Sequence, residues 1–215
     1  MPTFLALGDS YSIGEGVVAD ASWPMRLAAR LRANGLAIDD PRIIATTGWT
    51  TDELATAMDA ATIAPPCALV SLMVGVNDQY RGRALDETLR TFDELLQRAI
   101  ALAGDDAARV IVPSIPDWSA TPFGHASGRD PAEVSAQIDA FNRGEHDIVA
   151  RRGARWIDVT RASRAMANDP TLIVDDGLHP SPTMHDRWVQ IILPTALSVL
   201  GAAMPINTNA QATHR

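Results

Sequence analysis

Five short, nearly continuous apolar runs are spaced along the chain, and longer amphipathic segments separate them. The runs cover residues 3–7, 42–46, 68–75, 109–115 and 155–159. Apolar runs without alternation are typical of strands that are buried on both faces of a parallel sheet. We therefore predict five parallel strands at these positions.

Helical spacing of apolar residues marks the segments between the runs. Segment 22–35 places Met25, Leu27, Ala28 and Leu31 on one side and ends at Gly35. Segment 85–104 has a longer apolar stripe and stops at Gly104, and glycine is common just beyond a helix C-terminus. Both segments are predicted to be helices.

Two later helices carry clear N-terminal signals. Segment 130–153 opens with Asp130 as N-cap, Pro131 at the first helical position and Glu133 at the capping-box position. The last helix is expected to open with Ser181 as cap and Pro182 at its first position. Pro194 is expected to kink or shorten it, because proline lacks the N–H that a helix interior needs.

The alternation of strands and helices predicts a three-layer α/β/α sandwich with a five-stranded parallel sheet and right-handed connections. A length of 215 residues suits one domain, which we place at residues 1–204, and the polar residues 205–215 are expected to form a flexible tail. In such a sheet, ligands bind beyond the carboxyl ends of the strands. Functional residues are therefore expected just after the apolar runs.

Composition excludes several classes of protein. The net charge of −8 argues against sequence-independent nucleic-acid binding, which needs a basic face. The sequence contains no apolar run of membrane-spanning length and no recognisable signal peptide, so a cytoplasmic location is expected. The single cysteine, Cys67, lies in an apolar run and is expected to be a buried, inert thiol. No residue pattern indicates an oligomeric state.

The glycines near the N-terminus do not indicate a nucleotide-binding site. Gly14, Gly16 and Ala19 form a G-x-G-x-x-A pattern, but they lie six residues beyond Gly8 instead of directly after the strand. The phosphate loop and the G-x-S-x-G nucleophile elbow are both absent. These glycines are therefore expected to serve only the conformation of the loop.

A hydroxyl nucleophile needs a base, an acid that orients the base, and donors for the oxyanion. Asp176 precedes His179 by three residues, which lets the carboxylate reach one imidazole nitrogen and leaves the other free. Taken singly, each candidate has an ordinary structural explanation. Ser10 suits a turn or a helix cap, and Asn77 suits a turn.

Taken together, four motifs favour catalytic roles for these residues over structural ones. They are GDS at 8–10, TTGWTTDEL at 46–54, GVND at 75–78 and DGLHP at 176–180, each at a predicted strand end or in a loop on the same edge of the sheet. In this order they resemble the GDSL or SGNH hydrolase family, and most of all its bacterial esterase and lysophospholipase-like branch. One departure is Tyr11, where the family usually has leucine.

The resemblance implies a flavodoxin-like fold and a serine hydrolase mechanism without metal or cofactor. Ser10 would be the nucleophile, His179 its base and Asp176 the orienting acid. The oxyanion hole would comprise the N–H groups of Ser10 and Gly48 and the side-chain amide of Asn77. The alternative of a metal site formed by Asp175, Asp176, His179 and His185 matches no standard ligand spacing.

The substrate is expected to be a small ester with a short- to medium-chain acyl group, or a lysophospholipid-like ester. Tyr80, Trp118 and Phe123 follow the third and fourth strands and are candidates to line its pocket, or else to cover the core. Alternatives that keep the same triad are an acyltransferase and a carbohydrate or thioester deacylase. A non-catalytic binding protein of the same fold is a further alternative.

Overall fold

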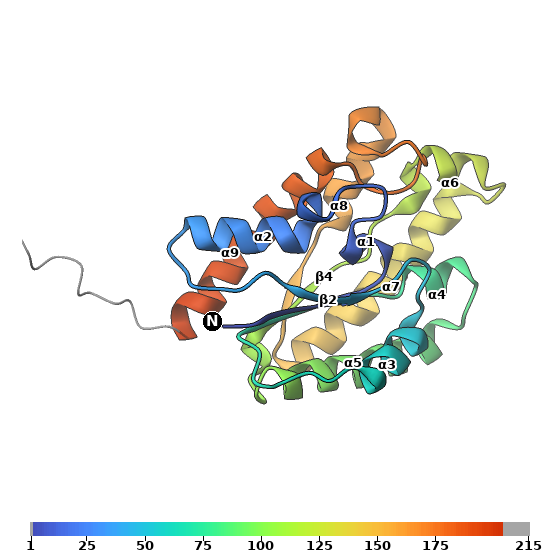
Figure 1. The fold of residues 1–215 in the computed structure, drawn as a ribbon. Coiled ribbons are helices and arrows are strands. Elements are labelled where there is room, and N and C mark those ends of the chain that lie inside the picture. The colour runs from blue at the N-terminus through green and yellow to red at the C-terminus, as the bar shows by residue number, and fades with distance from the viewer. Residues whose placement is uncertain (1, 204–215) are drawn as a thin grey trace, which may run out of the picture.

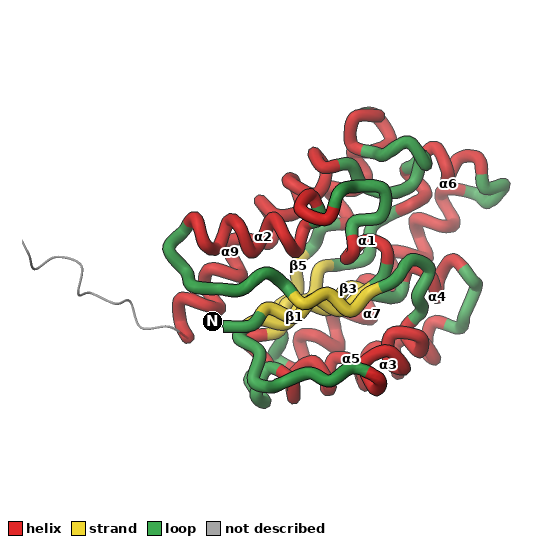
Figure 2. Tube along the Cα trace, in the orientation of Figure 1, coloured by secondary structure: helices red, strands yellow, loops and turns green. Residues whose placement is uncertain are grey.

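A computed structural model describes residues 2–203, so the predicted tail 205–215 lies outside the described residues. All five predicted strands are present and parallel, in the order β2-β1-β3-β4-β5. Figure 2 shows the strands in yellow at the centre of the molecule, with helices above and below them. They are β1 (Phe4–Gly8), β2 (Arg42–Ala45), β3 (Leu69–Met73), β4 (Val110–Pro113) and β5 (Arg155–Ile157). The α/β sandwich expected from the sequence is therefore confirmed.

Within residues 2–203, four long helices connect the strands, a fifth follows the last strand, and short helices follow the strand ends. The long ones are α2 (Trp23–Ala33), α3 (Thr51–Ala60), α5 (Leu85–Leu102), α7 (Pro131–Arg152) and α9 (Pro182–Ala203). The short ones are α1 (Ser10–Ile13), α4 (Val76–Tyr80), α6 (Pro122–Ala126) and α8 (Thr160–Ser163), joined by 3-10 turns such as η3 (Trp118–Ala120) and η4 (Arg164–Asn168). The short helices were not predicted, because they span too few residues to show a period.

The predicted helix signals are only partly realised. Asp130 caps α7 by accepting the Ala132 N–H at 2.9 Å, but Glu133 accepts from the Gln137 side chain instead of completing a capping box. The hydroxyl of Ser181 donates to the carbonyl oxygen of Thr171.

Helix α9 continues through Pro194 to Ala203, so the expectation that proline would shorten it is wrong. Packing explains this result, because Trp188, Ile192 and Ala196 of α9 are fully or almost fully buried. That burial outweighs the cost of one missing helical hydrogen bond.

The two faces of the sheet have separate cores. In β1, Phe4 and Ala6 face one core, while Leu5 and Leu7 face the other, as the alternation of a strand requires. Helices α2 and α9 cover the first face, and α3, α5 and the C-terminal half of α7 cover the second (Figure 1). Burial on both faces explains why the strands are apolar at nearly every position.

The strand order reverses between β1 and β3, which places a topological switch point at their carboxyl ends. Ser10 follows β1 and Asn77 follows β3. Ligand-binding crevices of doubly wound sheets form at this point. The fold therefore brings the first and third motifs together at the edge where a site is expected.

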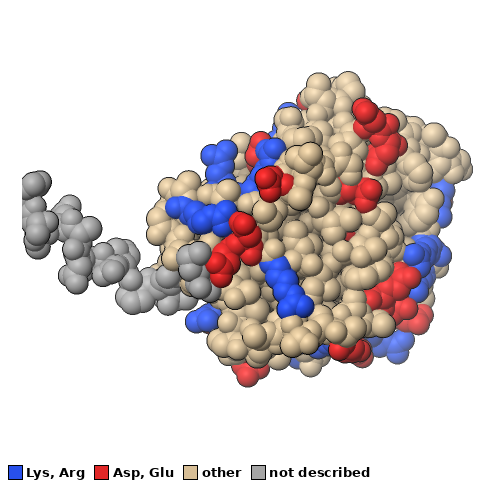
Figure 3. All heavy atoms as spheres, viewed as in Figure 1, with Lys and Arg blue, Asp and Glu red and all other residues tan. Residues whose placement is uncertain are grey.

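Two surface properties bear on the expected partners. No helix in residues 2–203 is both long and apolar enough to cross a membrane. Acidic and basic side chains are intermixed on the face shown in Figure 3.

Candidate active site

Ser10 is the first residue of α1, directly beyond the end of β1. The Asp9 carboxylate accepts the Tyr11 N–H at 3.0 Å and so caps this short helix. Ser12 has a fully buried hydroxyl without a hydrogen-bond partner among the described residues, and it does not line the pocket described below. The geometry therefore favours Ser10 over Ser12 as the accessible hydroxyl, and it assigns the capping role to Asp9.

Gly16 has a packing role that the sequence did not reveal. A Cβ atom at Gly16 would lie 2.6 Å from Val174 Cγ2, closer than side chains tolerate. Val174 precedes the acidic and histidine residues of the last motif. The glycine therefore lets the loop after α1 approach the segment that carries His179.

Gly48 lies in a tight turn after β2, in which the Trp49 N–H donates to the Thr46 carbonyl oxygen at 3.2 Å. Its φ of 82° is a conformation that glycine adopts without strain. The Arg81 guanidinium donates to the Gly48 carbonyl oxygen at 2.7 Å and fixes the turn to α4. Within the described residues, the Gly48 N–H donates to no protein acceptor.

Asn77 lies on α4, directly beyond β3. Its Nδ2 donates one hydrogen to the Trp49 carbonyl oxygen at 2.9 Å, which leaves the second hydrogen for another acceptor. The neighbouring Asp78 is buried and accepts from the backbone and hydroxyl of Thr51. Helix α4 is therefore tied to both ends of the short segment that joins the Gly48 turn to α3.

Asp176 and His179 belong to one short loop closed by its own hydrogen bonds. Asp176 Oδ2 lies 2.6 Å from His179 Nδ1, and Oδ1 accepts the backbone N–H groups of Leu178 and His179. Burial alone raises the pKa of Asp176, but these hydrogen bonds outweigh it and hold the pKa below its usual value. The carboxylate therefore stays ionised beside the imidazole.

A pocket of about 150 Å³ joins these elements. The predicted site residues that line it are Ser10, Gly48, Asn77, Tyr80, Trp118, Phe123 and His179. Asp176 does not line this pocket and is connected to it through its hydrogen bond to His179. No hydrogen bond links the Ser10 hydroxyl to His179 in the described part of the chain, and such bonds often form only when substrate binds.

Three aromatic rings form one wall of the pocket. The ring centroids of Tyr80 and Trp118 lie 5.3 Å apart, and Phe123 lies 6.1 Å from each. The Arg129 Cζ atom lies over the Tyr80 and Trp118 rings, 4.8 Å and 5.7 Å from their centroids. The lining is completed by four residues that carry no catalytic signature in the sequence: Tyr11, Thr47, Val76 and Leu178.

Asp9, Asp78 and Glu145 are buried acids, and the charge of Asp78 contributes to the raised pKa values of the other two. Burial, with a contribution from the charge of Asp78, raises the pKa of Asp9 to about 7. Burial also raises the pKa of Asp78, and it raises that of Glu145 well above its usual value. Desolvation therefore favours the neutral form of these acids.

The alternative of a metal site at Asp175, Asp176, His179 and His185 finds no support in the described part of the chain. Among the described residues, no group of three or more His, Cys, Asp or Glu side chains is arranged to hold a metal ion. His185 is completely buried, and burial lowers its pKa to about 3. Cys67 is a buried free thiol, as predicted.

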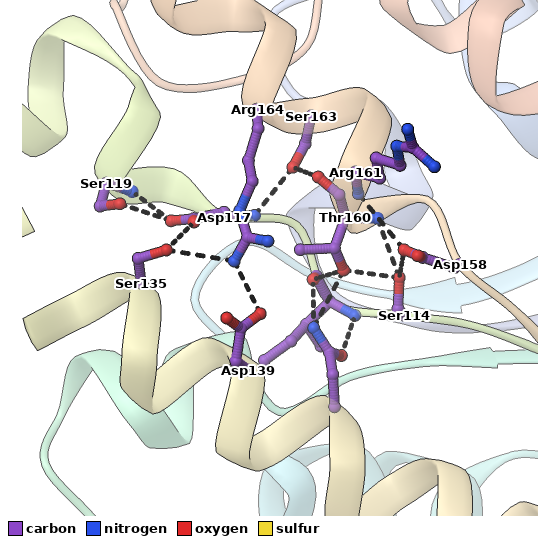
Figure 4. A network of polar contacts seen from close by, with 12 residues as sticks. Ser114, Asp117, Ser119, Ser135, Asp139, Asp158, Thr160, Arg161, Ser163 and Arg164 are labelled. Carbon is purple, nitrogen blue, oxygen red and sulfur yellow. Dashed lines mark hydrogen bonds and ion pairs between the residues drawn. The ribbon is translucent and has the colours of Figure 1, made fainter. Parts of the chain in front are cut away.

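The segment that carries Trp118 is held by a polar network (Figure 4). Asp117, with a side chain 2% exposed, accepts from Ser119, Ser135 and Arg164. Burial alone raises the pKa of Asp117, but these donors outweigh it and lower the pKa. The carboxylate therefore links η3 to α7 and η4.

The fold is flavodoxin-like, with a pocket at the switch point of the sheet. The sequence matches the GDSL-like Lipase/Acylhydrolase family over residues 6–187, and the chain belongs to this family. The family expectation drawn from the four motifs is thereby confirmed. No curated protein matches the sequence.

Several solved structures share the fold. TesA has a TM-score of 0.73 and 23% identity, over 92% of this chain and 99% of its own. The esterase EstA from Pseudoalteromonas sp., described as inhibited by monoethylphosphonate, has a TM-score of 0.72 and 18% identity, over 93% and 99%. Axe2, an acetylxylan esterase from Geobacillus stearothermophilus, has a TM-score of 0.66 and 20% identity, over 93% and 94%.

Proposed function

We propose that this protein hydrolyses small carboxylic esters through an acyl-enzyme on Ser10. Membership of the GDSL-like family supports ester hydrolysis in general. One observation carries the assignment of residues: Ser10 lines the same pocket as His179, whose Nδ1 is held by Asp176. This is the arrangement that a hydroxyl nucleophile requires.

In the proposed reaction, His179 Nε2 takes the proton of Ser10 as Oγ attacks the acyl carbonyl carbon. Asp176 holds the proton on Nδ1 and stabilises the imidazolium that forms. The imidazolium then gives its proton to the leaving alcohol oxygen as the carbon–oxygen bond breaks. A water molecule, deprotonated by His179, hydrolyses the acyl-enzyme and restores Ser10.

Three donors are assigned to the oxyanion. They are the N–H groups of Ser10 and Gly48 and the free hydrogen of Asn77 Nδ2, and each residue lines the pocket. Each such donor contributes about 3 kcal/mol to transition-state stabilisation. The hydrogen bond from Asn77 to the Trp49 carbonyl holds the amide in one orientation and supports this role.

The aromatic wall of the pocket supports a substrate whose acyl group is apolar. Tyr80, Trp118 and Phe123 line the pocket beside the proposed nucleophile. Esters with acetyl to butanoyl groups fit its volume, and lysophospholipid-like esters are the longer-chain alternative. The proposal requires no metal or organic cofactor.

Ser10→Ala tests the nucleophile, with Ser12→Ala as the matched control. Turnover of p-nitrophenyl acetate and butanoate is expected to vanish in Ser10→Ala and to persist in Ser12→Ala. A serine-directed fluorophosphonate is expected to add its mass to Ser10, as peptide mass spectrometry would show. Labelling at Ser12, or full activity of Ser10→Ala, would refute the assignment.

A further inference from the structure

We propose that Gln79 is a positioning residue that fixes Trp118 as the end wall of the acyl pocket and thereby limits the length of the acyl chain. This inference rests on the proposed ester hydrolysis at Ser10. It assigns a selectivity role to a side chain outside the pocket lining.

The indole of Trp118 is buried and held at its polar end. Its side chain lines the pocket, yet the residue is only 2% exposed. Its Nε1–H donates to Gln79 Oε1 at 2.7 Å, in a region shielded from water. A buried indole N–H that loses its acceptor is costly, so this bond favours one position of the ring.

Gln79 is itself held in one orientation. Its Nε2 donates to Gln137 Oε1 at 2.8 Å, and Gln137 Nε2 donates to Glu133 Oε1 at 3.2 Å. Only one assignment of the Gln79 amide places its oxygen toward the indole and its nitrogen toward Gln137. A chain of hydrogen bonds therefore runs from the surface of α7 to the wall of the pocket.

The backbone of Trp118 is fixed independently. Thr121 Oγ1 donates to the Trp118 carbonyl oxygen at 2.7 Å, and the preceding Asp117 is anchored by the network of Figure 4. With both the backbone and the indole tip held, the ring has little freedom to swing aside. A rigid wall selects ligands by size, whereas a mobile one adapts to them.

The pocket volume sets the expected limit. A cavity of about 150 Å³ accommodates a group the size of benzene, which has about six non-hydrogen atoms. The acyl chain stays bonded to Ser10 in the acyl-enzyme, so it is the part of the substrate that must fit beside the wall. Chains longer than about six atoms must displace Trp118 or leave through the mouth near Tyr80, which is 40% exposed.

The test compares kcat/KM for p-nitrophenyl acetate, butanoate and octanoate. In the native protein, kcat/KM for the octanoate ester is expected to be about tenfold or more lower than kcat/KM for the butanoate ester. Gln79→Leu keeps the side-chain size but removes the acceptor, and is expected to raise the octanoate-to-butanoate ratio about fivefold. Trp118→Ala is expected to raise it further, while Gln97→Leu on the exposed surface of α5 leaves the ratio unchanged.

A second readout follows the indole directly. The Trp118 Nε1–H resonance, assigned with Trp118→Phe, is expected to exchange with solvent faster in Gln79→Leu. Gln79→Glu retains an acceptor for the indole but loses the donor to Gln137, and is expected to recover part of the slow exchange and part of the short-chain preference. This separates positioning from a general loss of folding.

The outcomes distinguish this proposal from the proposed function. If the fluorophosphonate labels Ser10 but Gln79→Leu and Trp118→Ala keep the original chain-length ratio, Gln79 and Trp118 do not set chain length. Unchanged indole exchange in Gln79→Leu also contradicts the positioning role. If Ser10 is neither labelled nor required for turnover, ester hydrolysis at this site fails, and the selectivity proposal fails with it.

Discussion

The Asp176 carboxylate bonds to His179 through both of its oxygens. Oδ2 lies 2.6 Å from the ring Nδ1, and Oδ1 accepts the backbone N–H of the same residue at 2.9 Å. One carboxylate therefore sets both the tautomer of the ring and the course of the chain beneath it. Its removal has a chemical effect and a conformational one.

Asp176→Asn is expected to lower kcat/KM for p-nitrophenyl acetate by roughly 10³- to 10⁴-fold, because the amide favours the wrong imidazole tautomer. Asp175→Asn is the matched control, since Asp175 makes no hydrogen bond to His179 in the described structure. The control is expected to retain nearly full activity. Equal losses in the two variants would argue against the assigned acid.

Gly48→Ala is expected to lower the free energy of unfolding by about 1 to 2 kcal/mol, because alanine is strained at a φ of 82°. Gly82→Ala, at a φ of 70° and with open space around the added carbon, is expected to cost a similar amount. Only Gly48→Ala is expected to reduce kcat, by about 10- to 100-fold, because it displaces a proposed oxyanion donor. Urea unfolding and steady-state kinetics test the two effects separately. Equal kcat values in the two variants would contradict the role of Gly48.

Asp9→Asn is expected to make stability less dependent on pH. The pKa of Asp9 is about 7 in the folded state and near 3.8 in the unfolded chain, so the folded state holds the proton more tightly. This contribution to stability is complete below about pH 4 and is lost as pH rises through 7. Between pH 5 and 8, the free energy of unfolding of the native protein should therefore fall by about 2 to 3 kcal/mol. Asp9→Asn should not show this fall.

Urea unfolding at a series of pH values measures this difference. Asn at position 9 keeps an oxygen that can accept the Tyr11 N–H, so the cap of α1 is preserved. Asp20→Asn, at an exposed position, is the control and should follow the native pH profile. Parallel profiles for all three proteins would show that Asp9 is not protonated in the fold.

Arg164→Ala is expected to lower the free energy of unfolding by about 2 kcal/mol at pH 7, because the buried Asp117 charge loses its ion pair but keeps its serine donors. Arg161→Ala removes an exposed arginine that has no ion pair within the described residues, and should cost less than about 0.5 kcal/mol. The stability given by the lowered pKa of Asp117 is present above about pH 4 and is lost as pH falls. The difference in the free energy of unfolding between Arg164→Ala and the native protein should therefore be smaller at pH 3 than at pH 7. A constant difference, or equal costs for both arginines, would contradict this account of the network.

The sheet was predictable because each strand is buried on both faces and reads as an apolar run. The positions at which the strands end were less predictable from the sequence. The run 68–75 continues to Gly75, but β3 ends at Met73, because the chain turns into α4 through Gly75 at a φ of 124°. Hydrophobicity reports burial and not backbone direction, so it does not mark this turn.

The candidate site was predictable in its residue types but not in its supports. Ser10, Asn77 and His179 follow strand ends or precede a helix in recognisable motifs. Gln79 and Arg164 contact residues distant in sequence, Trp118 and Asp117, and such contacts leave no period or spacing in the chain. The ionisation of Asp9 was equally hidden, because it depends on burial beneath elements that lie far along the sequence.

Strand β1 lies between β2 and β3, and the pocket draws Ser10 from near one end of the chain and His179 from near the other. A chain emerging from the ribosome thus exposes its proposed nucleophile long before the proposed base has been synthesised. Chains that stop before the last motif retain Ser10 but lack the proposed base His179. The proposed hydrolysis therefore requires β1 and the last motif to have been synthesised and brought together in the fold.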